Sequence, residues 1–148
     1  MSATRSRAGI TQLSTIGIPV EDQDRSLAFY VDKLGLEKRM DVAYGQGERW
    51  LEVAPIGAAT KIALMRARDD APAGIDTQVR LTTDDARVEH ANLQSLGVDA
   101  DPEVMSYPVP MFSFRDPDGN RLVIVERPVA ERWRSGRAPS VPPAVLPD

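Results

Sequence analysis

The feature that most constrains this chain is an internal repeat of about 63 residues. Two segments carry the same series of signals: an aliphatic run, an aspartate-rich turn, a helical stretch and a Leu-Gly-aliphatic ending. Gly35 and Gly97 end the two helical stretches and lie 62 residues apart, while Asp22 and Asp85 precede them at a spacing of 63. A slip of one residue is small against that period. The sequence therefore predicts two tandem copies of one strand-and-helix unit.

The ends of both helical stretches carry suitable chemistry. An aspartate before a helix accepts hydrogen bonds from the free N–H groups of the first turn. A glycine after it adopts positive φ at little cost. Within the first helix, Leu27, Tyr30, Val31 and Leu34 recur at helical spacing and predict one buried face. In the second helix the best core candidates are Ala86, Leu93 and Leu96.

Strand signals follow each helix. They cover residues 49–53 and 61–65 in the first copy, and residues 111–114 and 121–125 in the second. The Asp-Pro-Asp-Gly-Asn stretch at 116–120 predicts the turn between the last two strands, because proline presets φ and Gly-Asn suits a turn.

The organisation expected from these signals is a fold over residues 11–127, with copies at about 11–66 and 74–127. Residues 1–10 are expected to form a flexible tail. Residues 128–148 are rich in proline, which predicts an extended or disordered extension.

Composition excludes several function classes. A net charge of −4 argues against nucleic-acid binding, and no apolar run approaches the roughly 20 residues of a membrane span. The chain has no cysteine, which removes disulfides and thiolate chemistry and fits a cytoplasmic protein. Its one histidine, His90, lies within the second helix and is expected to be structural or solvent-facing.

Four motifs in order closely resemble the vicinal oxygen chelate superfamily, the glyoxalase/bleomycin resistance protein/dioxygenase family. They are Pro19–Asp22, Ser26–Tyr30, Lys33–Leu36 and Phe114–Asn120, and the resemblance spans roughly residues 11–127. It implies an α+β fold of two tandem βαβββ modules, in which a U-shaped mixed sheet surrounds a cavity and the helices cover the outer face. It also implies that subunits pair as homodimers to complete their cavities.

Catalytic members of this superfamily commonly hold a divalent metal through His, Gln and Glu on the first, fourth, fifth and eighth strands. The resemblance places those positions at Thr15, near Ala63, at Gln78 and at Val123. Only Gln78 is of the usual ligand type, and a neutral amide with a hydroxyl holds a hard cation very weakly. We therefore expect no metal and no cofactor.

Strand alternation from these positions also predicts the cavity lining. Arg80 and Arg121 would point inward and offer several N–H donors to a carboxylate or phosphate. The alternative is that each arginine lies on the surface and pairs with an acid. The helix-facing set is then Ile16, Ile18, Val79, Leu81, Leu122 and Ile124.

Aromatic and sulfur-containing residues supply a candidate apolar wall, with ordinary core or interface packing as the alternative. The complete predicted ligand-binding set is Thr15, Trp50, Glu52, Gln78, Arg80, Tyr107, Met111, Phe112 and Arg121.

Three functions remain open. The first is a metal-free small-molecule-binding protein of the bleomycin-resistance type, whose ligand has a mostly apolar or aromatic body and an anionic or carbonyl group. The second is a lyase, isomerase or dioxygenase with a relocated or degenerate metal site. The third is a regulatory module with a vestigial cavity.

Overall fold

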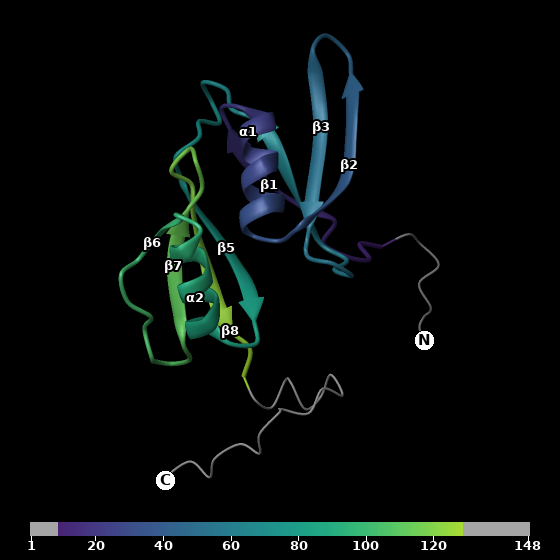
Figure 1. Cartoon of the computed structure of the whole chain (residues 1–148). Helices are drawn as coiled ribbons and strands as arrows, with labels where there is room; N and C mark the ends of the chain where they lie inside the picture. The colour runs from purple at the N-terminus through teal and green to yellow at the C-terminus, as the bar shows by residue number, and fades with distance from the viewer. Residues whose placement is uncertain (1–8, 129–148) are drawn as a thin grey trace, which may run out of the picture.

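The computed structural model describes residues 9–128, so the predicted extension beyond Pro128 and most of the N-terminal tail lie outside it. It contains two four-stranded mixed sheets of identical topology (Figure 1). Module 1 has the strand order β1-β4-β3-β2, and module 2 repeats it as β5-β8-β7-β6. This confirms the predicted tandem βαβββ modules. The strands are β1 (Thr15–Val20), β2 (Glu37–Tyr44), β3 (Glu48–Ala54), β4 (Lys61–Arg66), β5 (Asp76–Thr83), β6 (Asp99–Ala100), β7 (Met111–Arg115) and β8 (Arg121–Glu126).

One helical segment follows the first strand of each module. Helix α1 (Gln23–Ala28) continues directly as the π-helix η1 (Phe29–Lys33), and α2 (Ala86–Ser95) is regular. The predicted caps are confirmed, because Asp22 and Asp85 each accept a hydrogen bond of 3.1 Å from the backbone N–H three residues on.

The buried faces of the helices differ in part from the prediction. Tyr30 is fully buried, but Leu27, Val31 and Leu34 are only partly buried, while Ser26 and Phe29 take the inner positions. The π-helix explains the difference at Val31 and Leu34, because its wider turn rotates these residues relative to an α-helical stripe, whereas Ser26 and Leu27 precede it.

In α2, Ala86 and Leu93 are buried as predicted. The prediction for Leu96 is wrong, since this residue is 40% exposed at the helix end. His90 fills the core position between Ala86 and Leu93. Its ring stands edge-on to Phe112 at a centroid distance of 4.8 Å, and its Nε2 lies 2.7 Å from the Asp101 carbonyl oxygen. The histidine is therefore structural.

One hydrophobic core joins the helix-facing sides of both sheets. Phe29 of η1 contacts Phe114 of β7 with ring centroids 6.3 Å apart, so the first helical segment packs against the second sheet as well as its own. The helix-facing sides thus share one core inside the chain, and the opposite sides of the two sheets are here called the open faces. The predicted helix-facing set is confirmed, with Ile18, Val79, Leu122 and Ile124 buried and Ile16 and Leu81 packed against them.

The Asp116–Asn120 turn does more than reverse the chain. Asn120 is wholly buried, and its Nδ2 donates to the Pro19 carbonyl in module 1 at 2.8 Å. Its Oδ1 accepts from the backbone N–H groups of Gly74 and Ile75 at 2.8 and 3.0 Å. Asp116 accepts from the Tyr30 hydroxyl at 2.8 Å. The bonds to Pro19 and Tyr30 fasten the last turn of module 2 to module 1, and those to Gly74 and Ile75 hold it to the start of module 2.

The electrostatics at this turn follow from burial. Burial of Tyr30, and then the charge and hydrogen bond of Asp116, raise the pKa of the phenol well above its usual range. The hydroxyl therefore stays a donor at all ordinary pH values. Nearby, Asp118 accepts from Arg25 at 2.6 Å and adds an ion pair between the modules.

Candidate functional site

The open face of module 1 has a floor of small residues with apolar walls. Strand register sets Gly17 beside Ala63, Ala63 beside Glu52 and Glu52 beside Met40. A Cβ at Gly17 would lie 3.0 Å from the Met65 Sδ, so only glycine fits there without displacing that side chain. The exposed apolar side chains of β2 on this face are Met40, Val42 and Tyr44, which are 44%, 49% and 48% exposed.

A carboxylate is set into this apolar face. Glu52 is only 6% exposed, and its Oε2 accepts a hydrogen bond of 2.8 Å from the indole N–H of Trp50. Both residues belong to β3 and lie two positions apart, so they share the open face. Trp50 and Glu52 thus lie together on the open face of module 1, whereas Arg80 and Arg121 belong to module 2.

The open face of module 2 carries cations instead. Register aligns Arg80 with Val123 and Ser113, and Arg121 with Asp76 and Arg115. Arg121 pairs with Asp76 at 3.1 Å, and Arg115 pairs with Asp101 at 3.0 Å. Arg80 has no ion pair among residues 9–128, and its guanidinium donates only to the Gln78 carbonyl at 3.3 Å. Arg121 thus has the acidic partner of the alternative interpretation, whereas Arg80 has no such partner among residues 9–128.

Gln78 occupies an irregular position in β5. The register between β5 and β8 shifts between Asp76 and Arg80, and Gln78 has a φ of 63°, in the left-handed region. Its backbone N–H donates to the Asp76 carboxylate at 3.2 Å. The side chain is exposed beside Arg80.

The remaining predicted site residues are not all brought together. Met111 lies on the open face of module 2, aligned with Val125, and Thr15 is half-buried at the start of β1. Phe112 lies on the opposite side of β7, in the core, because neighbouring residues of a strand face opposite ways. We leave it out of the candidate site. Tyr107 is 83% exposed in the loop before β7.

The residues at the family's metal positions do not fit a metal. Ala63 and Val123 have no donor atoms, which leaves the Thr15 hydroxyl and the Gln78 amide as the only side-chain donors of the four. Within residues 9–128 no three His, Cys, Asp or Glu side chains gather as a cation site requires. Hydroxyl and amide oxygens without carboxylate or imidazole hold divalent cations weakly.

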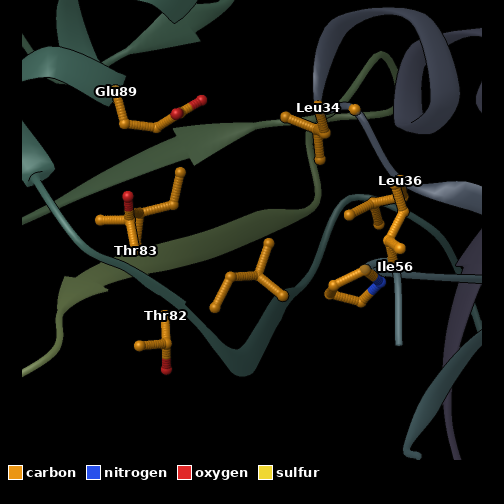
Figure 2. A pocket seen from close by; sticks show the side chains of 10 residues that line it. Leu34, Leu36, Ile56, Thr82, Thr83 and Glu89 are labelled. Carbon is orange, nitrogen blue, oxygen red and sulfur yellow. The ribbon is translucent and has the colours of Figure 1, made fainter. Parts of the chain in front are cut away.

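A separate pocket of about 220 Å³ lies at the junction between the modules. Figure 2 shows Leu34, Leu36 and Ile56 on its module 1 side, opposite Glu89, Thr82 and Thr83. Its lining is mostly apolar, and it contains none of the predicted site residues. The open faces are the better candidate, because polar groups without a full set of partners lie there within apolar surface.

Comparison with known families agrees with this architecture. The model of the Glyoxalase/Bleomycin resistance protein/Dioxygenase superfamily matches residues 12–124. The uncharacterized protein YetH of Bacillus subtilis is 29% identical over 124 residues, which are 79% of this chain and 99% of that protein.

Solved structures give the same answer. TnmS3, an antibiotic binding protein from Streptomyces sp. CB03234, is 32% identical with a TM-score of 0.71, and the match covers 82% of this chain and all of that one. A superfamily member from Sphaerobacter thermophilus is 35% identical with a TM-score of 0.72, covering 80% of this chain and 98% of that one. No helix within residues 9–128 combines the length and apolar character needed to cross a membrane.

Proposed function

Because the chain belongs to the glyoxalase/bleomycin resistance protein/dioxygenase superfamily, we propose that it binds a small molecule on its open faces without a metal. The observation that carries this proposal is that Arg80, which has no ion pair among residues 9–128, and the buried Glu52 both lie within apolar surface. At the same faces Ala63 and Val123 stand where the family has metal ligands. Similarity to an antibiotic binding protein supports a binding role. The lack of cysteine is compatible with a cytoplasmic setting.

The ligand class follows from the side chains. Trp50 and Met111 would contact a mostly apolar or aromatic body, and burial of that body contributes roughly 25 cal/mol per Å². Arg80 would hold an anionic or carbonyl group, and Gln78 would orient it through its amide. Such a charge-assisted contact is worth roughly 1.5–3 kcal/mol, or about ten- to hundred-fold in affinity.

We also propose a homodimer. The helix-facing sides of both sheets share one core within the chain, which leaves the open faces to be covered by a partner that encloses a cavity. A two-fold arrangement would set module 1 of one protomer against module 2 of its partner and form two equivalent cavities. The charges support this pairing, because one wall carries Glu52 and the other carries Arg80.

The test is a thermal-shift screen of aromatic carboxylates and carbonyl compounds against the full chain. Arg80→Ala should weaken the hits about ten- to hundred-fold, and Arg121→Ala should weaken them less because Asp76 already holds that guanidinium. Arg87→Ala, an exposed arginine of α2, is the matched control and should leave binding unchanged. Hits that bind Arg80→Ala and Arg121→Ala as tightly as the parent would remove both arginines from the site.

A further inference from the structure

One carboxylate oxygen of Glu52 has no hydrogen-bond partner among residues 9–128, and the proposed function does not explain this. Its side chain is more than nine-tenths buried, and its Oε2 is satisfied by the Trp50 indole. Its Oε1 has no hydrogen-bond partner among residues 9–128, and no Lys or Arg of that range forms an ion pair with it. Buried polar atoms in native proteins are nearly always paired, so an unpaired carboxylate oxygen calls for an explanation.

The surroundings of Glu52 point to a ligand as the missing partner. The strand neighbours of Glu52 are Ala63 on one side and Met40 on the other, and neither side chain can donate a hydrogen bond. Ala63 is itself covered, but Gly17, the next residue across the sheet, has no side chain and is exposed. A molecule that docks on this face over Gly17 and Trp50 would approach the carboxylate from the exposed side.

Trp50 strengthens the selectivity of this position. Its indole N–H is already committed to Glu52 at 2.8 Å, which fixes the orientation of the ring on the open face. The ring therefore presents apolar surface beside an acceptor. Arg80, on the other open face, can only donate. The two walls thus ask for opposite hydrogen-bonding groups.

We propose that Glu52 is a specificity-determining residue that selects ligands with a hydroxyl or amino donor on an aromatic ring, with Trp50 contacting that ring. This inference rests on the proposed binding function and narrows its ligand class. The ligand would carry a donor for Glu52 as well as the acceptor group for Arg80. A hydrogen bond to a charged group is stronger than a neutral one, so the donor should matter to affinity.

The experiment uses two probes of matched shape, 2-naphthol and 2-methoxynaphthalene, of which only the first donates a hydrogen bond. Each is titrated into the ¹⁵N-labelled full chain while the indole N–H signal of Trp50 is followed. The chain has two tryptophans, and Trp133→Phe assigns the signal. We expect 2-naphthol to bind about ten-fold tighter than the ether and to shift the Trp50 signal.

The variants make the test specific. Glu52→Gln keeps the shape but replaces a charged acceptor by a neutral one, so the preference should fall to about three-fold or less, and Glu52→Ala should abolish it. The spectra also report whether each variant is folded. Glu89→Gln, which removes the carboxylate of the junction pocket, should keep the full preference.

The outcomes separate this inference from the function on which it rests. Equal binding of both probes with a shifted Trp50 signal would overturn the role of Glu52 and leave the binding function standing. A preference that survives in Glu52→Gln and Glu52→Ala, or that disappears in Glu89→Gln, would also overturn it. Failure of both probes to bind would reject the inference, and an Arg80 screen without hits would reject the binding function.

Discussion

The two modules share one topology, but the equivalent turn of each module contacts the other module differently. The turn between the third and fourth strands covers residues 55–60 in module 1 and residues 116–120 in module 2. In module 2 this turn is bound to α1, η1 and β1 of the other module by Asp116, Asp118 and Asn120. In module 1 its residues Pro55 and Ile56 instead border the junction pocket of about 220 Å³.

Side-chain chemistry explains this difference. The turn of module 1 has no carboxylate or amide side chain, and its backbone is held within its own module, where Arg39 donates to the carbonyls of Ala58 and Pro55 at 3.0 and 2.8 Å. The turn of module 2 directs buried polar groups outward to a neighbour. Duplicated topology therefore does not ensure duplicated packing. A few polar side chains decide which of the two turns is hydrogen-bonded to the other module.

Removing the amide of Asn120 from the turn of module 2 should have the largest effect on stability. Asn120→Ala leaves two backbone N–H groups and two acceptors without their partner, and should lower the free energy of unfolding by roughly 3–5 kcal/mol. Thr60→Ala in the equivalent turn removes one exposed bond to the Leu13 carbonyl and should lose less than about 1 kcal/mol. Urea unfolding measures both. Equal losses of unfolding free energy would mean that the two turns contribute equally to stability.

The open faces provide the next test. The chain is expected to sediment at twice its mass of 16.2 kDa at micromolar concentration. Val42→Glu places a charge in the apolar strip beside Trp50 and should weaken the dimer about hundred-fold, or roughly 3 kcal/mol. Val88→Glu, on exposed α2, should leave the mass unchanged. A parent that sediments as a monomer contradicts the proposed pairing.

A smaller effect is expected from Tyr30→Phe, which removes the hydrogen bond from the Tyr30 hydroxyl to Asp116. The variant should lose about 1–2 kcal/mol, because Asp116 retains its other donors. The raised pKa of the phenol adds a pH dependence: below about pH 10 both states are protonated, and above it the unfolded chain alone ionises. Parent stability should therefore fall above about pH 10, by an amount that Tyr30→Phe lacks. Parallel curves for parent and variant in alkaline denaturation would refute this.

The smallest effect is expected from metal. A metal of the family type would link both modules, but Thr15 and Gln78 are the only donors at its four positions. EDTA or added Zn²⁺, Ni²⁺ or Mn²⁺ should shift Tm by less than about 1 °C, since weak binding gives little linkage stabilisation. We also expect no glyoxalase activity. Elemental analysis that finds one tightly held metal per chain would favour the lyase, isomerase or dioxygenase alternative.

The sequence predicted most of the fold because the signals involved were local. Capping aspartates, helix-ending glycines and strand alternation depend on near neighbours, and the repeat placed them in register. The sequence signals do not indicate strand β2, because charged residues stand between and before the alternating Met40, Val42 and Tyr44. Strand β6 has only two residues, too few to show a pattern.

The candidate site was predicted less completely because its features depend on long-range contacts. The pairing of Arg121 with Asp76, which distinguishes it from Arg80, joins strands 45 residues apart. Composition groups Met111 with Phe112, whereas strand geometry places them on opposite sides of β7. The Asp116–Asn120 motif predicts a turn, but the sequence does not show that Asn120 bonds to Pro19, 101 residues away.

The backbone at Gln78 has a consequence for how this chain balances stability against recognition. A left-handed φ costs a residue with a Cβ about 1–2 kcal/mol, a penalty that glycine avoids. Glycine at this position would therefore make a more stable protein, but it would remove the amide beside Arg80. Under the proposed function, the sequence that folds most stably and the sequence that holds a ligand best differ at this residue, and the chain carries the second. Thermostability selection alone would be expected to replace this glutamine early and to weaken recognition as it did so.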